Sequence, residues 1–392
     1  MKIAILGKGT SAIINILTCL KRGHEVEVYY DPNTPHLNIG ETVTPHIPKL
    51  ILDTLKLSIG DLIDEKVVSL KHGIIFDGWG VGNTFKHYFN ATNAIAFHFE
   101  CSVFNEFFNG ILEREIGIKY HPYKVEKYNI DLTKEKIIIN DIEYDHLICC
   151  SGWKESDEYK PPRFKTVNNA LLYSRECCDG EPYTYHIATE HGWKFGLTFP
   201  ERKLMKHGYL FNDQITSVDE ARESIGRPDA KHISWVPKYC KKMIQNRFVS
   251  YNGNRLAFSE PLHALSMHNY RIFAEYICSF VEDKKHETYV KYNQQYHHDL
   301  YATELAIAWH YSYGSKYKTA FWQDAKKRAE QFMNSSYIGD KDFYEDALYH
   351  DKKFGNHEMF GIGIFGYDDY FQIHAGMTGK KLEFKDTFIN LL

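Results

Sequence analysis

The chain has 392 residues, of which 43% are hydrophobic and 25% charged, and its formal net charge is −4. This length and apolar content suit one large α/β body or two domains. The near-neutral charge argues against a nucleic-acid partner, because neutralising phosphates needs a clustered basic surface. The sequence lacks a run of 18 apolar residues and a signal-peptide pattern, so we expect no membrane association and a cytoplasmic location.

Cysteine and histidine patterns predict neither a metal site nor a disulfide framework. The eight cysteines include two adjacent pairs, Cys149-Cys150 and Cys177-Cys178, which cannot close unstrained disulfides within themselves, and no C-x-x-C spacing occurs. The neighbouring histidines His297 and His298 point about 100° apart on a helix, so they do not share a metal-binding face.

The N-terminal residues 2–6 form an apolar strand signal that runs directly into a glycine-rich turn and a predicted helix over residues 10–22. The first glycine of the turn permits a tight change of direction, and the second lets the backbone approach a pyrophosphate. The next position of the pattern has a small residue, which lets the helix pack closely on the strand. The N-terminus of this helix favours negative charge. The predicted dinucleotide contacts are Gly7, Gly9, Thr10, Ser11 and Ala12.

A second strand over residues 25–30 ends at Asp31, about 20 residues past the glycines, where an acid accepts hydrogen bonds from ribose hydroxyls. The alternative is an ordinary βαβ unit with a glycine turn and no ligand. Further along the chain, we expect helices over 100–116, 218–225, 264–281 and 287–309, the second capped by Thr216 or Ser217. Expected strands are 124–128, 136–139, 147–150, 184–189 and 208–212.

Two segments at a fixed interval resemble the flavin-dependent halogenase family. The first, Leu37 to Pro45, contains Gly40-Glu41-Thr42, and the family carries a Gly-Glu-Ala/Ser-Thr-x-Pro segment beneath its flavin. The second, Leu70 to Trp79, matches the segment that bears the family's catalytic lysine, which corresponds to Lys71. A buried lysine in an apolar strand is costly without a purpose, although a lysine at a strand edge could also extend to water.

The resemblance covers most of the chain and implies an α/β fold: a Rossmann-like FAD domain of the flavin monooxygenase type, a substrate-covering sheet and a helical C-terminal region. The expected boundaries are 1–160 with 246–285 for the discontinuous FAD domain, 161–245 for the sheet and 286–392 for the helices. Family segments also match Phe85–Phe89, Ala257–Leu262 and Phe365–Met377. They assign His87, Phe89 and Phe365 to substrate binding, and Asn254, Pro261 and Met267 to cofactor binding.

The implied chemistry begins with reduced FAD, which takes up oxygen as a C4a-hydroperoxide. A bound halide attacks this group to give hypohalous acid, which Lys71 presents to a small electron-rich aromatic substrate as an ammonium or as a haloamine. No second glycine fingerprint for NAD(P)H occurs, so we expect a separate flavin reductase to supply reduced FAD. Formation of a homo-oligomer is left open.

The departures from the family pattern concern the residues that follow Pro261. His263 stands where the family has a supporting glutamate, and it is either a base that removes the ring proton or a satisfied core histidine. The backbone pair that binds halide falls on Leu265 and Ser266. Only eight residues separate Phe89 from His98, where tryptophan-specific members have a long enclosing segment. We therefore expect an open site that is not dedicated to tryptophan.

Two other functions remain open from the sequence. A flavin-dependent aromatic hydroxylase is favoured slightly by Phe195, which replaces the second tryptophan of a family motif that begins at Trp193. A flavin-binding protein without turnover is the third hypothesis.

Overall fold

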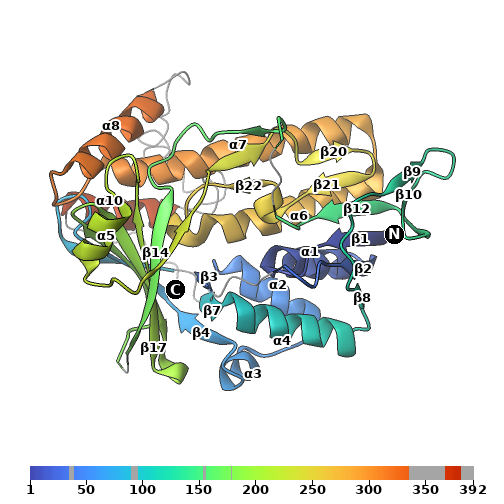
Figure 1. The fold of residues 1–392 in the computed structure, drawn as a ribbon, viewed down its shortest axis with the longest axis horizontal. Helices are drawn as coiled ribbons and strands as arrows, with labels where there is room; N and C mark the ends of the chain where they lie inside the picture. Colours follow the sequence, from blue (N-terminus) through green and yellow to red (C-terminus); the bar gives the residue numbers. More distant parts are fainter. Residues whose placement is uncertain (35–38, 90–95, 153–155, 178, 335–366, 381–392) are drawn as a thin grey trace, which may run out of the picture.

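The computed structural model describes residues 1–34, 39–89, 96–152, 156–177, 179–334 and 367–380 (Figure 1). Two large β-sheets lie at opposite ends of the view, and two long helices, α6 (Leu265–Asp283) and α7 (His286–Ser312), run along one side of the molecule. The described residues contain no helix that combines the length and the apolar character needed to cross a bilayer.

The six-stranded sheet is built around the predicted N-terminal strand. Each strand pairs in parallel with its neighbour except at one edge, where β20 and β21 are antiparallel. The predicted strands 2–6, 25–30 and 147–150 are confirmed within one residue at each end. The order across the sheet is β20 (Ile244–Asn246), β21 (Val249–Tyr251), β12 (His146–Cys149), β1 (Lys2–Leu6), β2 (Glu25–Tyr29) and β8 (Lys119–His121).

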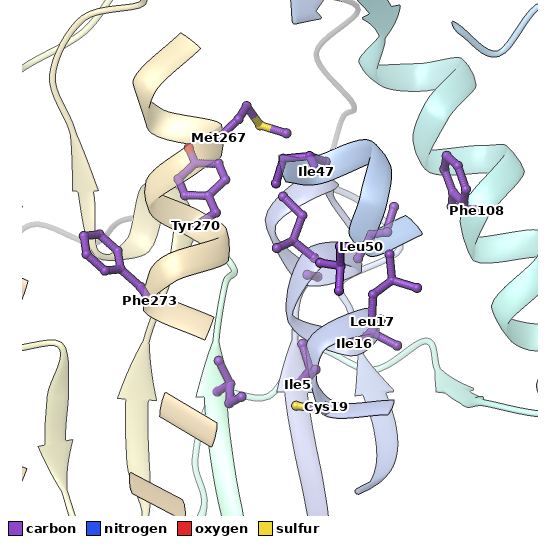
Figure 2. Packing of buried hydrophobic residues seen from close by; sticks show 14 of the residues in the cluster. Ile5, Ile16, Leu17, Cys19, Ile47, Leu50, Phe108, Met267, Tyr270 and Phe273 are labelled. Carbon is purple, nitrogen blue, oxygen red and sulfur yellow. The ribbon is translucent and has the colours of Figure 1, made fainter. Parts of the chain in front are cut away.

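Helices cover one face of this sheet and form the largest apolar core. Figure 2 shows Met267, Tyr270 and Phe273 of α6 on one side of this core, facing Ile47 and Leu50 of α2, with α1 below. The helices α1 and α4 confirm the predictions for residues 10–22 and 100–116. The bounds are α1 (Thr10–Lys21), α2 (His46–Leu55), α3 (Ile59–Asp64) and α4 (Cys101–Arg114).

A small antiparallel sheet packs on the other face through Ile137 and Ile139. It consists of β9 (Asn129–Asp131), β10 (Lys136–Ile139) and β11 (Ile142–Tyr144). The prediction of a strand over 124–128 is wrong, because that segment has no strand partner. Of its five side chains, Val125 alone packs on the core, while the others are exposed. Alternating burial is the pattern that predicts a half-buried strand, and this segment lacks it.

The seven-stranded sheet assembles segments from distant parts of the sequence. Most neighbours are antiparallel, but β5 pairs in parallel with β15. The predicted strand 184–189 is confirmed within β15, and the predicted strand 208–212 is confirmed in β17, which ends one residue earlier. The order is β18 (Lys231–Ser234), β14 (Asn169–Glu176), β17 (Leu204–Phe211), β16 (Gly192–Phe199), β15 (Tyr183–Thr189), β5 (Gly73–Asp77) and β6 (Thr84–Tyr88).

The apolar run 70–76 is divided between two sheets. Residues up to Lys71 belong to β4 (Val68–Lys71), which joins β3 (Gly40–Thr42) and β7 (Ala96–Glu100) in a three-stranded sheet. The next strand, β5, begins at Gly73 in the seven-stranded sheet. A Cβ at Gly73 would lie 2.1 Å from the carbonyl oxygen of His87, so only glycine fits this pairing with β6.

The remaining helices lie at the seven-stranded sheet. Their bounds are α5 (Val218–Ile225), α8 (Ala320–Asn334) and α10 (Tyr367–Thr378). Ser217 caps α5 in a capping box with Glu220, which confirms one of the two predicted caps. The predicted helices 264–281 and 287–309 correspond to α6 and α7. A further small sheet contains β13 (Tyr159–Lys160), β19 (Lys238–Cys240) and β22 (Ala257–Phe258). The domain boundaries expected from the sequence stay a prediction.

Candidate active site

The glycine turn after β1 has a backbone that only glycine adopts readily at its first position. Gly7 has φ +122°, a conformation that L side chains rarely adopt, and a Cβ there would lie 3.1 Å from the carbonyl oxygen of Cys150. A Cβ at Gly9 would meet no atom within 4 Å. The fold therefore requires glycine at position 7, while Gly9 leaves open space beside the turn.

The first turn of α1 is not capped by a side chain. Gly9 is its N-cap residue, and Ala12 is buried against the sheet. Thr10 Oγ1 donates a hydrogen bond of 3.1 Å to Asn105 Oδ1. Backbone N–H groups at an uncapped helix start can bind phosphate oxygens. Ser11 Oγ would lie 2.3 Å from a Cβ at Gly253, so this glycine permits close approach to α1.

The other predicted cofactor residues come from several elements. Asp31 lies two residues after the end of β2, and its Oδ1 accepts a hydrogen bond of 2.9 Å from the Asn33 N–H. Asn254 adjoins Gly253, and its Oδ1 accepts a hydrogen bond of 2.7 Å from the Tyr270 hydroxyl. Pro261 precedes the short 3-10 helix Leu262–Ala264, and Met267 points from α6 toward α2 (Figure 2).

The second predicted cofactor segment forms β3. Burial raises the pKa of the half-buried Glu41, and Thr42 Oγ1 donates to the Phe97 carbonyl oxygen at 3.2 Å. A Cβ at Gly40 would lie 3.1 Å from Leu197 Cδ1. Thr44 Oγ1 is buried and has no hydrogen-bond partner among the described residues. A buried hydroxyl without a partner fits a site that a polar ligand completes. Together with the uncapped start of α1, it makes the residues compatible with FAD.

Lys71 contacts the chain directly after β3. Strand β7 pairs with β3 on one side and with β4 on the other, and the Lys71 Nζ donates to the Val43 carbonyl oxygen at 3.5 Å. The side chain is 1% exposed, and no described carboxylate forms an ion pair with it. Burial lowers the pKa of Lys71 to about 7. The structure thus brings the two sequence segments together around a lysine that titrates near neutrality.

The surroundings of Lys71 are aromatic. Its Nζ lies 5.2 Å from the ring centroid of Phe89, whose backbone N–H donates to the His72 carbonyl oxygen at 3.1 Å. His98 of β7 is fully buried between Thr198 and Thr184, with which its ring nitrogens share hydrogen bonds of 3.1 and 2.8 Å. Burial, with a smaller contribution from the charge of Lys71, lowers the pKa of His98 to about 3.

His263 lies in a cluster of buried imidazoles that also contains the predicted substrate residue His87. The ring centroids of His263 lie 5.8 Å from His87, 5.7 Å from His186 and 4.4 Å from His310. His87 Nε2 is 2.7 Å from Asp369 Oδ1 of α10. Neither His186 nor His310 carries a sequence signal, because each looks like one polar residue in an ordinary strand or helix. Asp369 lies in the Phe365–Met377 segment, but no local pattern marks it as a partner of His87. The predicted substrate residue Phe365 lies outside the described residues.

The predicted halide residues are in the first turn of α6. Leu265 is 4% exposed, and Ser266 is half-buried. The helix starts at Ala264 without a side-chain cap. Its first N–H groups therefore have no side-chain oxygen to pair with, which suits an anion. Within the described part of the chain, no group of three or more His, Cys, Asp or Glu side chains is arranged to hold a metal ion.

A buried chain of hydrogen bonds supports the turn before α6. Trp193 Nε1 donates to the Tyr311 hydroxyl at 2.7 Å, and that hydroxyl donates to Glu260 Oε1 at 3.0 Å. Thr166 Oγ1 donates to Glu260 Oε2 at 2.7 Å. Burial nevertheless raises the pKa of Glu260 to about 7. This network connects the seven-stranded sheet to α7 and to the turn that carries His263.

Comparison with solved structures shows the same fold. A tryptophan halogenase from Shewanella frigidimarina matches with a TM-score of 0.80 and 15% identity, covering 96% of this chain and 89% of that one. A flavin-dependent halogenase from Xanthomonas campestris gives a TM-score of 0.78 at 15% identity, with 96% and 88% covered. A flavin-dependent halogenase from Brevundimonas gives 0.76 at 16% identity, with 96% and 89% covered.

Comparison with curated protein sequences gave no match. The sequence model of the tryptophan halogenase family matches residues 2–95 and 91–337, which is most of the chain and includes both the glycine turn and Lys71. The protein is therefore a member of the tryptophan halogenase family, a family of flavin-dependent oxidoreductases.

Proposed function

We propose that this protein is an FADH2-dependent halogenase that delivers hypohalous acid through Lys71 to a small electron-rich aromatic substrate. The observation that carries the proposal is the burial of Lys71, 1% exposed and without a described ion-pair partner, next to the β3 segment. A buried lysine with a depressed pKa, close to a candidate cofactor segment, is typical of a functional site.

The residues around the glycine turn would hold FAD. The start of α1 and Gly9 would face the pyrophosphate, Asp31 the ribose, and the β3 segment with Thr44 the flavin end. Together with oxygen and halide, bound reduced FAD supplies the oxidising equivalent that yields hypohalous acid. The N–H groups of Leu265 and Ser266, at the uncapped start of α6, would hold the halide.

Lys71 would act on the hypohalous acid in one of two protonation states. Because burial places its pKa at about 7, both forms are present near neutral pH. The ammonium form can donate a hydrogen bond to the hypohalous oxygen and make the halogen more electrophilic. The neutral amine can form a haloamine. His87 and Phe89 would contact the aromatic substrate, and the aromatic surroundings of Lys71 support this assignment.

The halide preference follows from the first turn of α6. Where the family pattern has Thr-Gly, this chain has Leu265 and Ser266, which gives apolar surface beside the anion. Such a site favours the halide that loses its water most easily, so we expect iodide or bromide to be used before chloride. Competition at equal halide concentrations tests this, and an excess of chlorinated product would contradict it.

A single assay tests the function. The protein is incubated with FAD, a flavin reductase, NADH, oxygen, monochlorodimedone and each halide in turn. Halogenated product supports the proposal. Oxygenated product that forms without halide would instead support an aromatic hydroxylase, which Phe195 in place of a family tryptophan favours. Flavin binding without either product would indicate a flavin-binding protein. The separate reductase and the cytoplasmic location remain predictions from the sequence.

A further inference from the structure

A cavity of about 40 Å³ lies between α6, α7 and the small sheet that contains β19 and β22. Polar side chains from both helices line it, namely Ser266, Asn269, Thr303 and Glu304. One water molecule needs about 10–15 Å³, and water occupies a cavity where polar groups can bond to it. This cavity has room for about three water molecules. It connects the carboxyl group of Glu304 with Ser266, which the proposed function places at the halide.

The carboxyl group of Glu304 is buried with only one oxygen bonded to the protein. The residue is 6% exposed, and its Oε1 accepts a hydrogen bond of 3.1 Å from the Arg163 N–H. Among the described residues, no donor bonds to Oε2 and no cation forms an ion pair with the carboxyl group. A buried polar oxygen without a donor is completed by water or by a ligand. Because Glu304 lines the cavity, water there can supply that partner.

The second carboxyl group on the cavity wall, Glu260, has a different role. Its Oε1 accepts a hydrogen bond from the Tyr311 hydroxyl and its Oε2 accepts one from the Thr166 hydroxyl, so each oxygen already has a donor. These bonds hold the turn before α6 in place. The cation on the wall, Lys238, has its Nζ 5.2 Å from the ring centroid of Tyr159. Glu304 is therefore the acid on this wall that can exchange a proton with water in the cavity.

The proposed chemistry consumes one proton from solvent in each turnover. Its balance is FADH2 + O2 + X⁻ + H⁺ → FAD + HOX + H2O, where X⁻ is the halide. Oxygen takes up four electrons, two from reduced FAD and two from the halide. The products contain three hydrogen atoms, and reduced FAD supplies two of them. The third comes from solvent, yet Leu265 beside the proposed halide position is only 4% exposed. This proton therefore needs a path through the protein.

The titration of Glu304 suits such a path. Burial raises the pKa of Glu304 to about 7, although the N–H and the charge of Arg163 oppose this shift. Near neutral pH the carboxyl group therefore exists in both forms and can give up and regain a proton. The titratable or charged groups that line the cavity or act on Glu304 are Arg163, Lys238, Tyr239, Glu260, Tyr270 and Tyr296. Burial raises the pKa values of the three tyrosines, so they stay neutral, and it raises the pKa of Glu260 to about 7.

We propose that Glu304 delivers the proton that halide oxidation consumes, through water in this cavity and the Ser266 hydroxyl. The inference rests on the proposed halogenase function. In each turnover the O–H bond of Glu304 breaks, and its proton passes along hydrogen-bonded water to the Ser266 hydroxyl. The hydroxyl passes its own proton to the oxygen atom that ends as water. The carboxylate then regains a proton from solvent on the side of Ser259 and Thr303, which line the cavity and are half-buried.

The test compares two variants of Glu304 with a control. Glu304→Gln keeps an oxygen that accepts from the Arg163 N–H but has no acidic proton, whereas Glu304→Asp keeps a carboxyl group on a shorter side chain. Glu287→Gln, at an exposed position of α7, is the matched control.

Two measurements are made at several pH values on both sides of neutrality. The first is the rate of hypohalous acid formation when chemically reduced FAD on the protein meets oxygen and bromide, in ordinary and in deuterated water. Because Lys71 would act after the oxidation, its own titration does not affect this rate. The second is the infrared absorption of protonated carboxyl groups in the protein without flavin.

We expect the rate of the wild type and of Glu287→Gln to fall as the pH rises through about 7. Glu304→Gln should be slower by about tenfold or more below that pH, should lose this pH dependence and should show a larger solvent isotope effect, because proton delivery becomes rate-limiting. It should also lack one carboxyl absorption that titrates near neutrality in the wild type without flavin. Glu304→Asp should keep an intermediate rate with a shifted pH midpoint.

A rate of Glu304→Gln equal to that of the wild type would overturn the relay. A lower rate that keeps the wild-type pH midpoint and isotope effect would do so as well, since it would assign Glu304 a structural role. If Glu304→Gln binds no FAD, Glu304→Asp decides: a shifted midpoint supports the relay, and an unshifted one overturns it. A wild type that forms no hypohalous acid would instead overturn the proposed function, and the relay with it.

Discussion

The protonation state of Lys71 is set by its place in the fold. Water is excluded from the side chain, and its Nζ has the Val43 carbonyl oxygen and the Phe89 ring nearby in place of a carboxylate. Removing an ammonium from water without a counter-charge is costly, and the group responds by losing its proton at a lower pH. The resulting pKa near 7 is a consequence of burial alone.

Removing the Lys71 amine should separate halide oxidation from halogen transfer. We expect Lys71→Ala to abolish halogenation of an organic substrate while FAD binding and peroxide release continue, because the lysine would act after the oxidation. Product analysis and flavin titration measure the two effects. The exposed Lys49 provides the control, since Lys49→Ala changes a surface ion pair with Asp53 of little energetic weight. Ordinary turnover by Lys71→Ala would show that the lysine is structural.

The same residue makes stability depend on pH. In the unfolded chain the pKa of Lys71 returns to about 10.5, so between pH 7 and 10.5 the unfolded state binds more protons than the folded state. The free energy of unfolding should therefore rise with pH in that window, by up to about 1.4 kcal/mol per pH unit. Below pH 7, the folded protein carries the full destabilisation that comes from burying the Lys71 ammonium.

The isosteric variant Lys71→Met lacks this titration. We expect it to be more stable than the wild type at pH 7, and the difference should shrink toward pH 10. Urea unfolding at several pH values measures both curves. Curves that run parallel over the whole range would mean that the lysine keeps its ordinary pKa.

At the residue scale, the sequence indicates candidate site residues only where a local pattern exists. The interval from Glu41 points to Lys71, and the place after Pro261 points to His263. His310 had no such signal. It is one of 21 histidines, and its partner is 47 positions away in the sequence. A contact of this kind is produced by the packing of α7 on the turn before α6, which no periodicity encodes.

At the element scale, the division between β4 and β5 positions the lysine. The run 70–76 looks like one apolar strand, yet His72 is exposed and the chain changes sheets there. The His72 N–H donates to the Pro182 carbonyl oxygen at 2.7 Å, which links the junction to the start of β15. In the sequence, Gly73 is the residue that indicates this junction, because a glycine inside a strand often marks a close backbone approach.

Gly73 should therefore be intolerant of a side chain. In Gly73→Ala the new Cβ would lie 2.1 Å from the His87 carbonyl oxygen, so β5 and β6 must separate and displace His87 and Lys71. We expect a loss of stability of about 3 kcal/mol with a loss of halogenation, measured by thermal unfolding and product formation.

Gly60→Ala is the matched control for this substitution. Gly60 is in α3, and a Cβ there would meet only Ser58 Oγ at 3.5 Å, an ordinary contact. We expect it to be neutral or to stabilise the protein by about 0.5 kcal/mol, since alanine favours the helix. Equal changes in stability for the two substitutions would show that β6 can move away from β5 without destabilising the protein.

At the scale of the whole molecule, the site forms where segments distant in sequence converge. The glycine turn and the β3 segment come from the first 45 residues, His263 from the turn before α6, His310 from α7, and Asp369 from α10. The sequence predicted the βαβ start and the long helices, since both have strong local periodicity. It could not predict that β5 would pair in parallel with β15, because this pairing depends on contacts between residues more than 100 positions apart.

The length of the chain between Phe89 and His98 bears on the substrates that this fold accepts. Eight residues lie between them, too few for the long segment by which tryptophan-specific members enclose the indole. Fewer enclosing contacts give less discrimination between ligands, so we expect turnover of several unrelated phenols, anilines and indoles with modest affinity. A screen by mass spectrometry with Lys71→Ala as the blank measures this range, because any product in the blank comes from free hypohalous acid. Turnover of free tryptophan alone, at one ring position, would show that other parts of the chain close the site.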